Sequence, residues 1–225
     1  MDTELILKQA LETLRKGGVI LYPTDTVWGI GCDATDPAAV ARVFEIKHRS
    51  DSKALVLLAA DLDMVARYVK VIPQMAIDLV EVNDAPMTLI YPGAIAGETP
   101  DQVGHDGVVI SSEVEKSQIS PQGRDDKVDH RRLAWNVVAE DGSVGIRIPM
   151  SEFCRQLAFK LGRPIVSTSA NISGEPTPQR FTDIAEEIKS AVDYACPPKT
   201  DTESTGKASQ IISIGLDGEV KIIRA

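Results

Sequence analysis

The sequence predicts one α/β domain with a largely mixed sheet. Segments that place apolar residues at helical spacing alternate with short apolar runs along all 225 residues, and this alternation is typical of α/β folds. Aromatic residues make up only 4% of the chain, so the core is expected to consist of Val, Ile, Leu and Ala. No internal repeat is visible in the sequence. We therefore expect a single domain over residues 1–225.

Helical and strand segments follow one another in the first hundred residues. Residues 4–16 place Leu5, Ile6 and later apolar side chains on one helical face, and Gly17 ends that helix. Asp36 as N-cap and Pro37 at the first helical position predict a helix over 36–49 with a basic end. Further helices are expected at 61–69 and 72–82, and strands at 19–24, 54–59 and 87–92.

Residues 97–132 differ in composition from the rest of the chain. They are polar, charged and turn-rich, with one apolar island at 108–110. We expect an insertion that forms a mobile surface loop, with a hairpin around the island as the alternative. The α/β pattern then resumes. Strands are expected at 142–149 and 164–170, helices at 151–161 and 182–192, and a closing hairpin over 209–225 that turns at residues 216–218.

Composition and charge exclude several classes of protein. No apolar run approaches the roughly 18 residues of a membrane span, and the first residues lack the layout of a signal peptide, so we expect a cytoplasmic protein. The net charge of −9 argues against a broadly basic nucleic-acid surface. Neither the cysteines (Cys32, Cys154, Cys196) nor the histidines show metal-ligand or disulfide-framework spacing. We therefore expect reduced thiols and no metal held by protein ligands.

Polar residues lie at the ends of predicted elements, where ligands commonly bind in α/β folds. Such residues occur in the stretches 22–26, 47–49, 143–147 and 169–171. Lys47 and Arg49 flank one residue, and on an extended segment both side chains would point the same way, which suits a polyphosphate. The alternative is a basic helix C-terminus that the helix dipole stabilises.

Three more polar residues are expected to contact either a ligand or another part of the protein. Arg147 lies in an otherwise apolar strand, and a buried arginine requires a carboxylate from the protein or from a ligand. Ser169 and Asn171 lie on one strand face, where they bind a ligand or cap the next turn. No Gly-x-x-x-x-Gly-Lys phosphate loop and no full dinucleotide fingerprint is present.

In combination these segments resemble the Sua5/YciO/YrdC family. The resemblance rests, in order, on residues 21–34, 44–59, 87–93, 142–149 and 164–178. It includes the family's Lys-x-Arg signature at Lys47 and Arg49 and its Ser-x-Asn signature at Ser169 and Asn171. It covers residues 4–225 except roughly 97–132, and it implies a twisted open mixed sheet of the YrdC type with a large concave ligand cavity.

The resemblance implies a nucleotidyltransferase that makes L-threonylcarbamoyladenylate and pyrophosphate from L-threonine, bicarbonate and ATP. The product would pass to the threonylcarbamoyl transferase machinery that completes the t6A modification of tRNA. Lys47 and Arg49 match the family's catalytic phosphate contacts, and the implied ATP contacts also include Ser143, Asn171 and Arg224. The implied L-threonine contacts are Thr24, Arg147, Ser169 and Ser209. Mg²⁺ is expected with ATP, held mainly by phosphates and water.

Other functions are alternatives to this enzyme. A YciO-type paralogue would share the fold but have little synthase activity. An RNA- or nucleotide-binding protein with weak RNA affinity is a second alternative, although the acidic charge counts against it. A carbamoyl-adenylate domain like those of hydrogenase maturation proteins is a third, but the chain is too short for the zinc and acylphosphatase modules that accompany that domain.

Overall fold

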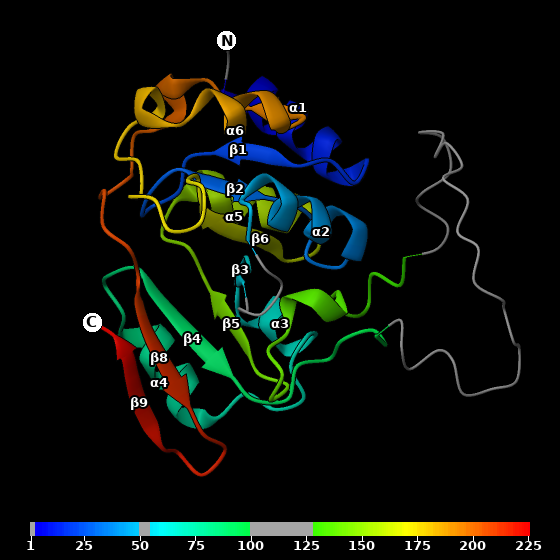
Figure 1. Ribbon diagram of the computed structural model, residues 1–225. Coiled ribbons are helices and arrows are strands. Elements are labelled where there is room, and N and C mark those ends of the chain that lie inside the picture. Colours follow the sequence, from blue (N-terminus) through cyan, green and yellow to red (C-terminus); the bar gives the residue numbers. More distant parts are fainter. Residues whose placement is uncertain (1–2, 50–54, 100–127) are drawn as a thin grey trace, which may run out of the picture.

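A nine-stranded mixed sheet forms the centre of the computed structural model, which describes residues 3–49, 55–99 and 128–225. The strand order is β7-β1-β2-β6-β3-β5-β4-β8-β9. The strand axes rotate from one strand to the next, so the sheet is twisted (Figure 1). Neighbours are antiparallel except in the pairs β1–β7, β3–β5 and β4–β8. The strands are β1 (Ile20–Tyr22), β2 (Gly29–Gly31), β3 (Val56–Leu58), β4 (Met87–Tyr91), β5 (Val144–Arg147), β6 (Ile165–Ser169), β7 (Tyr194–Ala195), β8 (Gln210–Ile214) and β9 (Val220–Arg224).

Six α-helices and three short 3₁₀ turns accompany the sheet in the described part of the chain. The helices are α1 (Thr3–Arg15), α2 (Pro37–Ile46), α3 (Leu62–Ala66), α4 (Gln74–Val82), α5 (Glu152–Leu161) and α6 (Glu186–Ala191). The 3₁₀ turns are Trp135–Val137, Phe181–Asp183 and Pro198–Thr200. The predicted N-cap Asp36 is confirmed, since it accepts hydrogen bonds from Ala38 and Ala39. Ser151 caps α5 in the same way and accepts a hydrogen bond from the amide of Cys154. The predicted fold class is confirmed as well.

Several predicted boundaries were wrong. The helix expected at 36–49 ends at Ile46, and the one expected at 61–69 spans only α3. The helix expected at 182–192 is split into the 3₁₀ turn Phe181–Asp183 and α6, because the residues between them leave the helical conformation. Strand β2 was missed because Gly-Ile-Gly has little intrinsic strand propensity, and β7 because it is only two residues long.

Aliphatic side chains fill the core as predicted. Strands β1 and β2 are fully buried, and α1 packs against α5 and the β1–β7 edge of the sheet. The buried face of α1 includes Leu7, whereas Leu5, which was expected there, is 45% exposed. The helix is therefore rotated slightly from the face that the apolar pattern suggested. None of the helices in the described ranges is both long and apolar enough to cross a membrane.

The predicted insertion at 97–132 lies mostly outside the described residues, which omit 100–127. Its two stems can be placed. Ala96 and Leu133 form a parallel bridge, the amide of Gly97 donates to the carbonyl of Leu133 at 2.8 Å, and the amide of Leu133 donates to that of Ile95 at 2.8 Å. The chain thus leaves and re-enters the sheet region at adjacent points. The closing hairpin is confirmed, with Gly218 at φ 88° in the turn between β8 and β9.

Candidate functional site

A cavity of about 250 Å³ lies at the strand ends in the middle of the sheet. Loops that follow β1, α2 and β6 contribute to its wall, together with the segment that leads from β7 into β8. Its lining residues are mostly small, hydroxylated or cationic: Thr24, Thr26, Val27, Gly29, Arg49, Val56, Arg147, Ser167, Thr168, Ser169, Thr177, Gly206, Ala208, Ser209, Ile211 and Arg224. All four predicted threonine contacts, and two of the five predicted ATP contacts, are among them.

The Lys-x-Arg signature lies at a helix C-terminus, the alternative to an extended segment that the sequence had left open. Lys47 caps α2, and His48 adopts the left-handed conformation with φ 49°. The amide of His48 donates to Glu45 and the amide of Arg49 donates to Phe44, each at 3.0 Å, which is a Schellman motif. The reversal sends Arg49 into the cavity wall, where its guanidinium also lies 5.8 Å from the Phe44 ring centroid.

Lys47 and Asn171 join the end of α2 to the end of β6. Lys47 is only 3% exposed, and its ammonium group donates to the carbonyl oxygens of Ser169 and, at 2.7 Å, of Asn171. Asn171 Oδ1 accepts from Ser169 Oγ at 2.5 Å, and its Nδ2 donates to Ile172 and Glu175. The side chain of Asn171 therefore caps the turn after β6. Capping was the alternative to ligand binding that the sequence left open. Neither Lys47 nor Asn171 lines the cavity.

Arg147 has an internal partner. Its Nη1 lies 3.0 Å from Asp25 Oδ1 and donates to Thr26 Oγ1 at 3.1 Å, and both members of the ion pair are 4% exposed. Thr24 Oγ1 donates to the Val27 carbonyl at 2.8 Å, so the 2.8 Å contact between the two threonine hydroxyls is donated by Thr26. The hydroxyl of Thr24 is thus used within its own loop. The sequence left open whether the carboxylate beside Arg147 comes from the protein or from a ligand. In the structure it comes from the protein, from Asp25.

One edge of the Arg147 guanidinium makes no hydrogen bond within the described residues. Nη1 makes both polar contacts, and the buried Nε has no acceptor in this part of the chain. An unsatisfied buried donor costs roughly 1–3 kcal/mol. The Nε–Nη2 edge has the geometry that binds a carboxylate through two parallel hydrogen bonds.

Arg224 and Ser209 also line the cavity. The guanidinium of Arg224, at the end of β9, donates from Nε and Nη2 to the carbonyl of Ser209 at 2.9 and 2.8 Å. The hydroxyl of Ser209 lies 2.8 Å from that of Thr88 on β4. These contacts bring the closing hairpin of the chain to the same cavity as the loop after β1.

The cavity is cationic in an otherwise acidic protein. Burial and the nearby charge of Arg49 lower the pKa of Lys47 to about 8. Burial lowers the pKa of Arg49, and burial together with the charge of Arg147 lowers that of Arg224. Each shift shows that the positive charge is held at a cost in free energy. A bound anion would offset that cost, so the arrangement favours anionic ligands.

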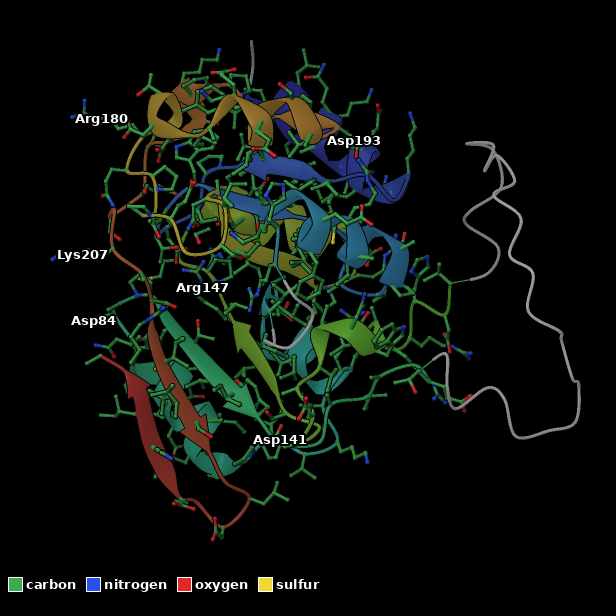
Figure 2. All side chains as sticks on the ribbon, in the orientation of Figure 1. Asp84, Asp141, Arg147, Arg180, Asp193 and Lys207 are labelled. Carbon is green, nitrogen blue, oxygen red and sulfur yellow. The ribbon has the colours of Figure 1, made fainter. Side chains whose placement is uncertain are left out.

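Ser143 is not brought to this cavity. It precedes β5, whose other end carries Arg147, and four residues of strand span roughly 13 Å. Its amide instead donates to Asp141 at 2.9 Å, and Figure 2 shows Asp141 well away from Arg147. The sequence did not single out Asp25 or Thr26. Their only signal was membership of the polar stretch 22–26 beside Thr24.

The described residues contain no group of three or more histidine, cysteine, aspartate or glutamate side chains that could hold a metal ion. The three cysteines are buried and unpaired with one another. Fold and site together define an α/β protein with a cavity lined by cationic and hydroxylated side chains at its strand ends.

The sequence comparisons identify the family. The Sua5/YciO/YrdC family model, whose description reads "Telomere recombination", matches residues 12–114 and 125–225. The chain is 33% identical over 177 residues to threonylcarbamoyl-AMP synthase of Stenotrophomonas maltophilia, which covers 79% of this chain and 77% of that protein. It is 30% identical to the synthase of Chromohalobacter salexigens, covering 83% and 82%. The chain belongs to the Sua5/YciO/YrdC family.

Solved structures show the same fold. P. abyssi Sua5 complexed with L-threonine superimposes with a TM-score of 0.68 at 25% identity, covering 95% of this chain. This chain spans only 52% of that protein's length. E. coli YciO superimposes with a TM-score of 0.66 at 24% identity over 99% of this chain and 89% of its own. The YrdC-like fold expected from the sequence is therefore confirmed.

Proposed function

We propose that this protein is an L-threonylcarbamoyladenylate synthase that supplies t6A modification of tRNA. The observation that carries the proposal is the guanidinium edge of Arg147 that has no hydrogen-bond partner among the described residues and lies in a cationic cavity. This edge suits the carboxylate of an amino acid. Support comes from relatives that are named threonylcarbamoyl-AMP synthase and from a structural relative whose crystals contained L-threonine.

In the proposed reaction the amine of L-threonine and bicarbonate form a carbamate with loss of water. A carbamate oxygen then attacks the α-phosphorus of ATP and pyrophosphate leaves. Arg147 holds the threonine carboxylate, while Arg49 and Arg224 neutralise phosphate charge as it develops on the transferring and leaving groups. Lys47 acts from behind the wall by holding the carbonyl groups of Ser169 and Asn171 in place.

The hydroxyl groups and the apolar side chains of the cavity wall each have a role in this proposal. Ser169 and Ser209 can orient the substrate amine and carbamate, since a hydroxyl both donates and accepts. Val27, Val56 and Ile211 keep part of the cavity dry, which would protect the labile carbamate from hydrolysis. Mg²⁺ fits this chain only as the companion of ATP, bound by phosphate oxygens and water, because the wall offers cations in place of carboxylates.

The direct test is incubation of the purified protein with ATP, bicarbonate and labelled L-threonine, followed by detection of the labelled adenylate and of pyrophosphate. The matched variant is Arg147→Lys, which keeps a cation for Asp25 but cannot offer two parallel donors. We expect adenylate from the wild type and a loss of at least about 100-fold in the variant, mostly as a higher KM for threonine. No adenylate from folded wild-type protein would contradict the proposal and favour a YciO-type paralogue.

A further inference from the structure

Among the described residues, Asp25 is the carboxylate that contacts the cavity's buried arginine, and it lies outside the set of lining residues. Its Oδ1 is 3.0 Å from Arg147 Nη1, and its Oδ2 accepts from the amide of Met150 at 2.9 Å. The residue is 3% exposed. A ligand in the cavity would therefore meet Arg147 and not Asp25.

The backbone of Asp25 is fixed as firmly as its side chain. Its carbonyl accepts from the amide of Thr205 at 3.2 Å and from the Thr205 hydroxyl at 3.1 Å. Asp25 thus links the loop after β1, the end of β5 and the segment that leads into β8. These contacts leave the carboxylate little freedom to move, so Asp25 holds a fixed position beside Arg147.

The two contacts to Arg147 fall on the same nitrogen. Asp25 Oδ1 contacts Nη1 as an ion pair without a hydrogen bond, and Thr26 Oγ1 accepts a hydrogen bond from the same nitrogen. The Nε–Nη2 edge has no partner in the described ranges. A carboxylate that bridged Nε and Nη2 would have used the donors that a ligand needs. The observed arrangement neutralises the buried charge and still keeps one complete donor pair.

We propose that Asp25 is a positioning residue, which holds Arg147 Nη1 so that the Nε–Nη2 edge meets the carboxylate of the amino-acid substrate. This inference deepens the proposed function and rests on it for the identity of the substrate. Asp25 touches neither substrate nor reacting atoms. Its effect on binding is exerted entirely through the orientation of Arg147.

The test compares ligands that differ only in the carboxylate. L-threonine and L-threoninol are titrated calorimetrically into wild-type protein and Asp25→Asn, which keeps the shape and an acceptor for Met150. We expect Asp25→Asn to weaken L-threonine binding by about 30-fold or more, since the guanidinium loses the charged partner that fixes its orientation, and to leave the weak binding of L-threoninol unchanged. In an Arg147→Met background, Asp25→Asn should have no further effect on threonine.

A second variant covers the case in which Asp25→Asn fails to fold. Asp25→Glu keeps the ionic partner but moves the carboxylate by one methylene, so threonine binding should weaken by about 5-fold with the fold retained. Wild-type affinity for L-threonine in either folded variant overturns the inference. Equal losses for L-threonine and L-threoninol also overturn it, because they indicate general damage to the cavity.

A ligand-independent measurement separates this inference from the proposed function. The Arg147 Nε–H resonance in a ¹⁵N correlation spectrum, or a crystal structure of Asp25→Asn, reports whether the guanidinium turns when Asp25 loses its charge. A turned guanidinium supports the inference, and an unchanged one overturns it whatever the cavity binds. Failure of the wild-type protein to bind L-threonine at all counts against the proposed function alone.

Discussion

Lys47 and Arg49 are neighbours in one signature but have different roles. Arg49 lines the cavity, whereas Lys47 is buried and donates to the carbonyls of Ser169 and Asn171. We expect Arg49→Ala to cut adenylate formation by about 100-fold or more, a loss far larger than its effect on stability. Lys47→Ala should lower activity and also destabilise the fold by about 1–3 kcal/mol, because the carbonyl groups of Ser169 and Asn171 each lose a charged donor.

Turnover and urea unfolding of both variants, measured side by side, test this division. Two further effects of Lys47→Ala act in opposite directions. Loss of the buried methylene groups of Lys47 lowers stability further, whereas removal of a buried charge that is costly to desolvate raises it. A Lys47→Ala variant that is as stable as the wild type and yet inactive would show instead that the lysine acts on the phosphates.

For single residues, the sequence predicted well which side chains lie at the cavity. It predicted less well which atoms each side chain contacts. Thr24, Arg147, Ser169 and Ser209 all line it as expected. The turn at Lys47 was missed because a left-handed histidine has no reliable sequence signal, although histidine tolerates this conformation better than most residues. Pairing between residues distant in the sequence, such as Asp25 with Arg147, is set by the folded topology.

At the scale of elements, strand β2 shows why some strands escape detection. Gly31 lies between β1 and β6, and a Cβ atom there would come within 2.4 Å of the Val166 carbonyl oxygen and 2.7 Å of Tyr22 Cε1. The strand needs glycine because its neighbours approach so closely. Long apolar strands such as β4 are predictable from composition, whereas β2 is determined by what surrounds it.

The close approach at β2 gives a prediction with an internal control. Gly31→Ala should destabilise the protein by about 3 kcal/mol, because backbone and ring atoms must move apart. A Cβ atom at Gly145, in β5, would meet only Thr88 Cγ2 at 3.5 Å among the described residues, which is an ordinary contact, so Gly145→Ala should change stability by less than about 1 kcal/mol. Equilibrium unfolding in urea measures both. Similar losses in the two variants would mean that β2 has room for a side chain.

At the scale of the whole molecule, the buried cysteines make stability depend on pH in the alkaline range. Burial raises the pKa of Cys32, Cys154 and Cys196, that of Cys154 from 9.0 to about 12. Above pH 9 the unfolded chain therefore releases thiol protons that the folded chain keeps. The folded state then binds more protons, so stability is fully present below pH 9 and falls as pH rises, by about 1.4 kcal/mol per thiol for each pH unit.

Lys47 acts in the opposite direction. Its pKa is lowered from 10.5 to about 8, so between these values the unfolded chain binds the extra proton and stability rises with pH. Three thiols outweigh one lysine, and we expect the free energy of unfolding to fall by about 2–3 kcal/mol between pH 9 and pH 10. Urea unfolding across this range measures the fall, and Cys154→Ala should reduce it by about a third, about 1 kcal/mol. A fall of the same size in Cys154→Ala would show that this thiol ionises equally in the folded and unfolded states.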